Sequence, residues 1–272
     1  MRRQDKKVAV VTGGAQGIGK AVSHRLSAEG ALVVIADINS ERGEITREEI
    51  CSRGRKAIFL QADIAQVDQI FRMTQQVVEQ AGRIDILVNC AGILQNREFL
   101  DVTEQDWNRI IDVNQRGVAF ACQAVARQMV AQVPEDVRRA GRADRSYGKI
   151  VNFSSISGRR GRAHQIHYAS TKAAIISITQ SIALALAPYN INVNAISPSV
   201  VATAMWQQAD REKSELLGLP PGKALKDYIE TIPLKRAGTG EDMAAAVAFL
   251  CSHEADYITG QTINVDGGYE MD

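Results

Sequence analysis

The stretch KVAVVTGGAQGIG, residues 7–19, decides the fold class of this chain. Its first half is an apolar, β-branched run, typical of a strand buried on both faces. Its second half carries glycines that let the backbone turn tightly and approach a phosphate, and a predicted helix follows whose first N–H groups are free. An ordinary strand–helix turn is the alternative. The stretch predicts a nucleotide phosphate site formed by Gly13, Gln16, Gly17, Ile18 and Gly19.

The same kind of strand recurs along the whole chain and alternates with amphipathic segments. Strands are predicted at 7–12, 32–36, 57–62, 84–89, 149–153, 191–196 and 262–266. Helices are predicted at 18–29, 41–53, 66–81, 104–131, 168–187 and 241–252. This alternation predicts an α/β fold, a Rossmann-type doubly wound parallel sheet of about seven strands with helices on both faces. No composition break divides the chain, so we expect one domain over residues 1–272.

Two segments interrupt the alternation. Residues 132–147 are charged and poor in helix signals, and they lead into a strand, so we expect a solvated surface loop at the edge opposite to the ligand site. A contact with a partner protein is the alternative for this loop. Residues 203–232 follow the sixth strand on the ligand side and look like two helices around GLPPG, which predicts a lid over the pocket.

Composition excludes several classes of function. The net charge of +1 gives no electrostatic reason for nucleic acid or membrane as the main partner. The apolar run 173–187 falls short of a membrane span, and the basic start is followed by too few apolar residues for a signal peptide. The four cysteines and four histidines show no metal-binding spacing, so no metal is expected. We expect a cytoplasmic protein with a small-molecule ligand.

Acidic and small residues at the ends of the next strands extend the predicted nucleotide site. Asp37 ends the second strand, where a carboxylate binds an adenosine ribose diol and repels a 2′-phosphate. No basic residue occupies 15–16 or 38–39, so NAD is favoured over NADP. Asp37 as a turn former and Asp63 as a helix cap are the alternatives. The further contacts predicted here are Ile38, Asp63, Ile64, Asn89, Ala91 and Gly92.

The sequence YASTK, residues 168–172, places a phenol and an ammonium four residues apart at the start of an apolar helix. Residues at this spacing share a helix face. A nearby ammonium stabilises a phenolate, so we expect Lys172 to lower the pKa of Tyr168 and make it a general acid or base near neutral pH. The alternative is a half-buried helix tyrosine whose hydroxyl meets water.

Together these motifs resemble the short-chain dehydrogenases/reductases over nearly the whole chain. The resemblance rests on TGGAQGIG (12–19), NCAG (89–92), DVNQRG with Asn114, NFSSISG with Ser155, YASTK (168–172), PSVVAT (198–203) and DGG (266–268). It implies the catalytic set Asn114, Ser155, Tyr168 and Lys172. Tyr168 would exchange the proton, Ser155 would hold the substrate oxygen, Lys172 would also bind the nicotinamide ribose, and Asn114 would hold a water behind the lysine.

The resemblance also implies cofactor contacts after the sixth strand and an oligomer. The cofactor residues implied there are Pro198, Ser199, Val201, Thr203 and Met205. Two positions depart from the family pattern, Cys90 in place of a second Asn and Ser199 in place of Gly, and the latter puts the local backbone geometry in doubt. The family pairs the helices predicted at 104–131 and 168–187 across two-fold axes, so we expect a homotetramer or homodimer.

The substrate is a secondary alcohol or ketone if the resemblance holds. GRRG followed by YASTKAAIISITQS resembles bacterial sorbitol (polyol) dehydrogenases, whereas TAMWQQADRE with GLPPGKAL resembles acetoin and butanediol dehydrogenases. We favour a polyol or sugar alcohol, with acetoin or diacetyl as the alternative. A non-catalytic NAD-binding sensor or scaffold is the alternative from another class. The substrate contacts predicted are Leu94, Ser155, Ile156, Arg162, Tyr168 and Trp206.

Overall fold

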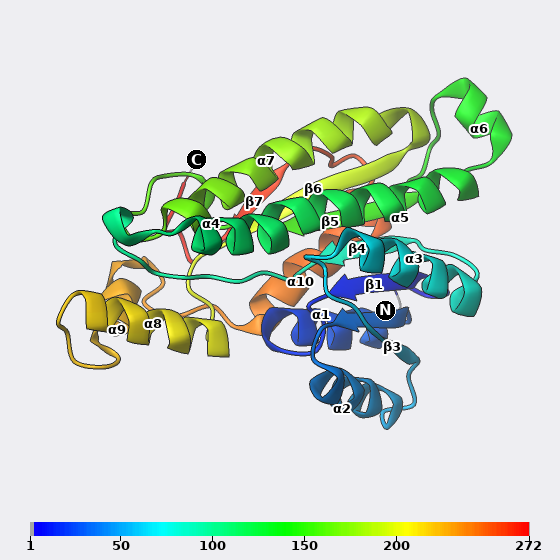
Figure 1. The fold of residues 1–272 in the computed structure, drawn as a ribbon. Helices are drawn as coiled ribbons and strands as arrows, with labels where there is room; N and C mark the ends of the chain where they lie inside the picture. The colour runs from blue at the N-terminus through cyan, green and yellow to red at the C-terminus, as the bar shows by residue number, and fades with distance from the viewer. Residues whose placement is uncertain (1–2, 272) are drawn as a thin grey trace.

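One parallel sheet organises the computed structural model, which describes residues 3–271. Residues 1, 2 and 272 of the predicted domain lie outside this range. The strands are β1 (Val8–Thr12), β2 (Leu32–Asp37), β3 (Ala57–Gln61), β4 (Ile86–Asn89), β5 (Gly148–Phe153), β6 (Ile191–Pro198) and β7 (Thr262–Val265). Their order is β3-β2-β1-β4-β5-β6-β7, all parallel (Figure 1). The predicted fold class is therefore confirmed. The order reverses between β1 and β4, which opens a crevice at the carboxyl ends of the strands.

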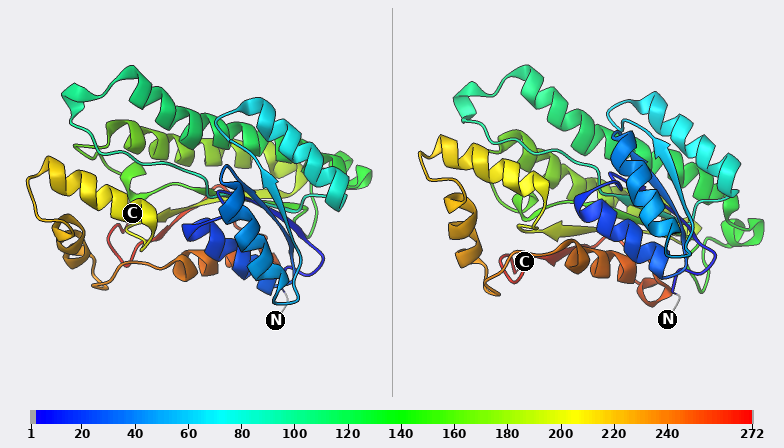
Figure 2. Two further views of the ribbon diagram at one scale, coloured as in Figure 1. Left: turned by 60° about the horizontal axis from the view of Figure 1, so that its bottom comes forward. Right: turned by 90° about the horizontal axis from the view of Figure 1, so that it is seen from below.

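Two layers of helices cover the two faces of the sheet (Figures 1 and 2). The helices are α1 (Gly17–Ala28), α2 (Ser40–Cys51), α3 (Val67–Ala81), α4 (Glu104–Ile111), α5 (Val118–Gln132), α6 (Glu135–Ala140), α7 (Ile166–Leu186), α8 (Ala204–Leu216), α9 (Lys223–Thr231) and α10 (Gly240–Leu250). One core cluster joins the sheet to α3, α5 and α7, and the other joins it to α1, α2 and α10. Each strand is apolar on both sides because each face meets a helix layer.

The single helix predicted at 104–131 is wrong. The chain forms α4, then a wide π-helical turn over Asp112–Gly117, and then α5. The extra residue in such a turn changes the direction of nearby side chains, and here it turns Asn114 into the interior, where the side chain is fully buried. Gly117 packs so closely against the segment between β3 and α3 that a Cβ there would lie 2.5 Å from the Ile64 carbonyl oxygen.

The segment 132–147 also differs from its prediction, because it contains the short helix α6. Glu135 and Asp136 stand in its first turn, Arg138 and Arg139 in its last turn, and Gly141 follows in the left-handed conformation. These charges complement the helix dipole, and the glycine ends the helix, so a local signal was present in the sequence. The segment does lie at the amino ends of the strands, away from the crevice (Figure 1).

The segment 203–232 forms α8 and α9, which project beyond the carboxyl ends of the strands (Figures 1 and 2). The two helices are tied together by Asp210 of α8. Its carboxylate accepts hydrogen bonds from the backbone N–H groups of Gly222 at 2.8 Å and Leu225 at 2.7 Å. This side chain therefore caps α9, a contact that no local sequence pattern indicates.

Helix α7 is the longest helix in the described part of the chain, and most of its residues are apolar. By length and composition alone, Ile166–Tyr189 would be long and apolar enough to cross a membrane, and it is longer than the run 173–187 considered from the sequence. In the structure its inner side belongs to the core, where Ile175, Ala183 and Leu186 are buried. Leu184 on its outer side is 78% exposed. The helix is thus a core helix with one partly apolar outer face.

Candidate active site

A cavity of about 760 Å³ occupies the crevice at the carboxyl ends of the strands. Its wall is built from the glycine loop, the segment after β4, the end of β5, the start of α7, the end of β6 and the lid helices. All but two of the residues predicted for catalysis, cofactor or substrate lie on this wall. The two exceptions are Asn89 and Asn114. The volume lies within the range of roughly 300–1,000 Å³ that is usual for ligand pockets.

The glycine loop presents its backbone to the cavity. Gly13 has φ +64°, and a Cβ there would lie 2.6 Å from the Cα of Ala91, so only glycine fits this crossing. Helix α1, which lies wholly within the described residues, has no side-chain cap and no acidic residue in its first turn. Its first N–H groups are therefore available to an anion, which the helix dipole also favours.

Asp37 lies at the end of β2 and is 7% exposed. Its carboxylate accepts hydrogen bonds from the backbone N–H of Ala15 at 3.1 Å and of Asn39 at 3.0 Å. The carboxylate thus holds the glycine loop in place as well as lining the cavity. The alternative reading of Asp37 as a local turn former is also realised, because one of these bonds reaches only two residues along the chain.

Arg42 is a cavity residue that the sequence reasoning missed. It stands in the first turn of α2, where its own N–H is capped by the Asn39 side chain at 2.9 Å. Its guanidinium donates a hydrogen bond to the Gln16 side chain across the adenosine end of the cavity. The prediction of NAD rested on the absence of basic residues at 15–16 and 38–39. The first turn of the following helix returns to the same edge, which the sheet topology could have suggested.

Asn89 does not contribute its side chain to the cavity. The side chain is buried in the core, where its amide donates a hydrogen bond of 2.9 Å to Asn152. Asn152 in turn donates to Thr179 of α7 at 3.0 Å. The predicted cofactor contact of Asn89 is therefore not supported by its position, since buried amides must satisfy their hydrogen bonds locally.

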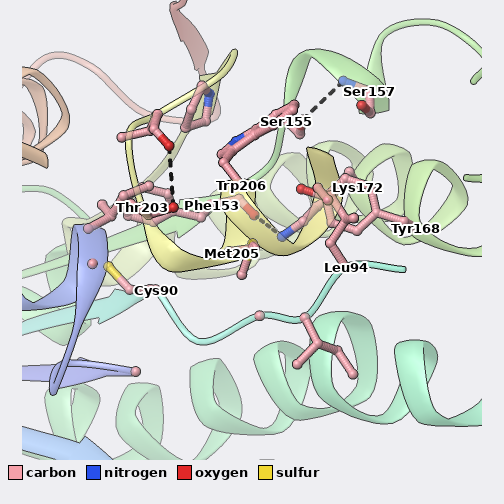
Figure 3. Close-up of a pocket in the computed structure, with 18 of the residues that line it drawn as sticks. Cys90, Leu94, Phe153, Ser155, Ser157, Tyr168, Lys172, Thr203, Met205 and Trp206 are labelled. Atoms are coloured by element: carbon pink, nitrogen blue, oxygen red, sulfur yellow. Dashed lines mark hydrogen bonds between the residues drawn. The ribbon is translucent and has the colours of Figure 1, made fainter. Parts of the chain in front are cut away.

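Ser155, Tyr168 and Lys172 meet on one wall of the cavity (Figure 3). Ser155 follows β5 and caps the short 3₁₀ turn Ile156–Gly158. Its hydroxyl oxygen accepts a hydrogen bond of 3.1 Å from the N–H of Ser157. Tyr168 and Lys172 stand in the first turns of α7. The Lys172 ammonium donates to the Phe153 carbonyl oxygen at 2.8 Å and lies 5.6 Å from the centre of the Tyr168 ring.

Burial governs the ionisation of this trio in the structure. It raises the pKa of Tyr168 to about 12, and a hydrogen bond with Ser155 opposes that rise. It also lowers the pKa of Lys172 to about 8. Desolvation of the phenolate outweighs the lowering of the Tyr168 pKa that is expected from Lys172, whose ammonium faces the Phe153 carbonyl. Tyr168 is a neutral phenol at neutral pH, the form that donates a proton to a carbonyl oxygen.

Asn114 lies behind the wall and holds the segment after β4. Its side-chain oxygen accepts from the Ile93 N–H at 2.8 Å, and its side-chain nitrogen donates to the Ile93 carbonyl at 2.8 Å. This two-bond clasp fixes the backbone next to Gly92, whose Cβ position would lie 3.3 Å from the amide oxygen and 3.7 Å from the Lys172 nitrogen. The role of holding a water stays a prediction.

The substrate side of the cavity contains every predicted contact residue and several that were missed. Leu94, Ile156, Arg162 and Trp206 line it as expected. The missed residues come from the loop after β4, the lid and the C-terminal tail; they are Asn96, Lys213, Tyr228 and Tyr269. Tyr228 stacks on Tyr269 with ring centres 5.1 Å apart, and Trp206 lies 5.9 Å from Tyr228. These residues are far apart in sequence, so only the fold brings them together.

The two departures from the family pattern are both accommodated. Ser199 donates a hydrogen bond of 3.0 Å to the Asp266 carbonyl. Among residues 3–271 it is not one of the non-glycine residues with a positive φ, so its backbone does not require glycine. Cys90 lines the cavity as a thiol whose pKa is raised by burial, and it behaves as a small apolar side chain.

Comparison with known proteins agrees with this geometry. The family model described as enoyl-(acyl carrier protein) reductase matches residues 13–270. A sorbitol dehydrogenase from Cereibacter sphaeroides is 40% identical over 269 residues, which cover 99% of each chain. The chain belongs to the short-chain dehydrogenase/reductase family. The family marks this protein as an oxidoreductase of alcohols or ketones that uses a nicotinamide cofactor, and the catalytic roles of Ser155, Tyr168 and Lys172 stay predictions.

Other members of this family with high similarity differ in the substrate that their names indicate. An L-2,3-butanediol dehydrogenase from Corynebacterium glutamicum is 38% identical, covering 96% of this chain and 98% of its own. A 3-oxoacyl-[acyl-carrier-protein] reductase from a Staphylococcus epidermidis strain is also 38% identical, covering 97% and 99%. The crystal structure of levodione reductase matches with a TM-score of 0.87 and 29% identity over 98% of both chains. Similarity at this level shows the reaction class.

The cofactor end of the cavity fits a nicotinamide dinucleotide. The uncapped start of α1 can receive a diphosphate, and Asp37 stands where its carboxylate would accept hydrogen bonds from a ribose diol. Gly92 and Ala91 keep the wall next to Lys172 free of bulky side chains. The residues that would hold the cofactor are therefore those predicted from the sequence, without Asn89 and with Arg42 added.

Proposed function

We propose that this protein is an NAD-dependent dehydrogenase of a polyol or sugar alcohol. The observation that carries the reaction is the placement of Ser155, Tyr168 and Lys172 on one wall of a cavity that also holds a dinucleotide site. The similarity to sorbitol dehydrogenase supports a polyol. Similarity to L-2,3-butanediol dehydrogenase supports a small vicinal diol, or acetoin in reverse, as the second candidate.

The chain's own residues perform the proton transfer in this proposal. The cofactor, when bound, accepts or supplies the hydride. Ser155 holds the substrate oxygen, and the neutral Tyr168 donates a proton to a ketone oxygen. In the direction of alcohol oxidation the phenolate form of Tyr168 accepts the proton and becomes the neutral phenol, and the charge of Lys172 favours that phenolate. Lys172 remains fixed by its bond to the Phe153 carbonyl.

The preference for NAD rests on Asp37. A carboxylate at the end of β2 repels a 2′-phosphate, and its two backbone hydrogen bonds keep it in place. Arg42 opposes this preference, because a guanidinium on the same part of the wall would attract that phosphate. We expect NAD to win because Asp37 is buried and fixed, whereas Arg42 is exposed and engaged with Gln16.

The test is reduction of NAD⁺ and of NADP⁺ by the purified protein with D-sorbitol, galactitol and butane-2,3-diol, followed by absorbance. Tyr168→Phe should abolish turnover and leave cofactor binding intact. The matched control is Tyr257→Phe, because Tyr257 is fully exposed and should change nothing. Asp37→Ala should shift the preference toward NADP⁺. Cofactor binding without turnover on any alcohol or ketone would favour the sensor instead, and activity of Tyr168→Phe would sink the mechanism.

We also propose a homotetramer or homodimer that uses the outer faces of α4, α5 and α7. Support comes from α7, whose outer face combines the exposed Leu184 with small residues such as Ala173 and Ser177. Such a face allows close approach of a second helix. Light scattering should give a multiple of the 29.6 kDa chain mass, and Leu184→Glu should weaken the assembly. A monomer at micromolar concentration would refute this proposal.

A further inference from the structure

Arg162 enters the substrate side of the cavity with unused hydrogen-bonding capacity. It precedes α7 in the loop after Ser155, and it lines the same cavity as Tyr168. Its Nη2 atom is buried and has no hydrogen-bond partner among residues 3–271. Within that range no carboxylate lies within 4.0 Å of its guanidinium. A buried donor of a charged group that lacks a partner is costly, so its presence indicates a ligand that supplies an acceptor.

The carboxylates near Arg162 are already occupied by other groups. Asp210 caps α9 with both of its oxygens. Asp266 accepts from the backbone N–H of Gly268 at 2.9 Å and of Glu270 at 2.7 Å. Glu270 itself pairs with Arg160. Asp210 and Asp266 could turn to Arg162 only by breaking a helix cap or a backbone turn, and Glu270 lies within 4.0 Å of Arg160 but not of Arg162.

A second cation lines the same cavity. Lys213 stands on α8 seven residues after Trp206, so both side chains lie on the face of the lid helix that meets the cavity. In the part of the chain that the structure describes, Lys213 makes no ion pair within 4.0 Å. His164, which also lines the wall, is engaged with Glu98 at 3.3 Å. The substrate side thus carries two unpaired cations.

The aromatic row of the cavity holds the guanidinium in place. This aromatic row consists of Trp206, Tyr228 and Tyr269. The Arg162 guanidinium carbon lies 5.8 Å from the centre of the Tyr269 ring, and the Tyr269 ring stacks on Tyr228. A guanidinium over an aromatic ring keeps its charge and its planar fork of donors while losing little mobility on binding. Such a fork matches the geometry of a carboxylate or phosphate.

We propose that the substrate carries an anionic group, a carboxylate or a phosphate, that Arg162 binds with Lys213 as a second cation. The reacting hydroxyl or carbonyl is a separate group of the same molecule, at Ser155 and Tyr168. This inference rests on the proposed function and narrows its substrate class from neutral polyols to hydroxy acids or polyol phosphates. A carboxylate and a phosphate offer the same kind of acceptor oxygens to these two cations, and the kinetic test distinguishes between them.

The kinetic test compares substrates that differ only in the anionic group. D-sorbitol, D-sorbitol 6-phosphate and D-gluconate form one set, and butane-2,3-diol with 2,3-dihydroxybutyrate forms a second. A charge-assisted pair should raise kcat/KM for an anionic member about tenfold to hundredfold over its neutral partner. The kcat/KM values for D-sorbitol 6-phosphate and D-gluconate then show whether a phosphate or a carboxylate fits the site better. A neutral member that is used equally well or better in both sets would overturn the proposal.

Variants locate the effect at Arg162. Arg162→Gln should remove the advantage of the anionic substrates through KM, whereas Arg162→Lys should keep part of it. Arg211→Gln is the matched control, because Arg211 lies exposed on α8 outside the cavity and should have no effect. An unchanged ratio of anionic to neutral substrate in Arg162→Gln would contradict the assignment.

A binding measurement separates this proposal from the proposed function. The chain has two tryptophans, so Trp107→Phe leaves Trp206, which contacts Tyr228, as the single tryptophan. Gluconate or sorbitol 6-phosphate should then quench or shift the fluorescence at concentrations at least about tenfold below those of sorbitol. Anion binding that requires Arg162 without turnover of any alcohol would refute the dehydrogenase and support the site. Turnover of alcohols without preferential anion binding would refute the site alone.

Discussion

The Asn114 clasp makes a quantitative prediction about stability. Asn114→Ala removes two partly buried hydrogen bonds to Ile93, each 2.8 Å long, and a longer one of 3.5 Å to Thr171, and it leaves the N–H and the carbonyl of Ile93 without these partners. Each unsatisfied backbone group costs about 1–3 kcal/mol, and Ile93 is only partly buried, so we expect a loss of about 2–4 kcal/mol in the free energy of unfolding. Urea unfolding followed by fluorescence measures this loss.

Two further variants sharpen this experiment. Asn108→Ala is the matched control, because Asn108 is exposed on α4 and should change stability by less than about 0.5 kcal/mol. Asn114→Asp retains an acceptor for the Ile93 N–H and loses the donor to its carbonyl, so it should lie between wild type and Asn114→Ala. If Asn114→Ala unfolds at the wild-type urea concentration while activity is lost, the clasp does not stabilise the fold. The role of Asn114 would then be purely in proton transfer.

Three other predictions concern the wall and its supports. Gly158→Ala should lower kcat with little change in cofactor affinity, measured by steady-state kinetics and cofactor titration, because a Cβ there would lie 2.6 Å from the Lys172 carbonyl and displace Ser155. Burial lowers the pKa of Lys172 from 10.5 to about 8, so the folded protein binds fewer protons there than the unfolded chain. Wild type should therefore gain stability relative to Lys172→Met as pH rises from 8 to 10.5 in unfolding titrations; a flat difference would contradict the assigned shift. The Arg236 ion pair and the Thr239 cap hold the pKa of Asp242 below its usual value, so the stability that Asp242 adds is present at neutral pH. The advantage of wild type over Asp242→Asn should disappear as pH falls below about 4 in the same assay.

Local patterns in the sequence predicted the elements that depend on local physics. The glycine loop was predicted because its turn and its close crossing with Ala91 need glycine wherever they occur. The strands were predicted because each is apolar on both faces. Errors arose where local signals were weak or were overlooked, as in the helix α6, or where a helix pattern concealed an extra residue, as in the π turn around Asn114.

Ionisation in the site could not be predicted from spacing alone. The i,i+4 arrangement of Tyr168 and Lys172 is real, but the direction of each pKa shift depends on burial and on which atom the ammonium faces. Lys172 faces the carbonyl of Phe153, a residue of β5 that lies 19 positions away in the sequence. Sequence spacing contains no information about that partner.

By itself, the sequence determined the doubly wound sheet and the position of the nucleotide loop, because both follow from residue types at short spacing; the trio of Ser155, Tyr168 and Lys172 was predicted from the resemblance to the family. The tertiary structure alone decided what surrounds them. Arg42 reaches Gln16 from the next helix, and Tyr228, Tyr269 and Lys213 join Arg162 from the lid and the C-terminal tail. Such contacts depend on where crossovers and packed helices place distant segments, and the charge balance that selects a substrate is set by those contacts.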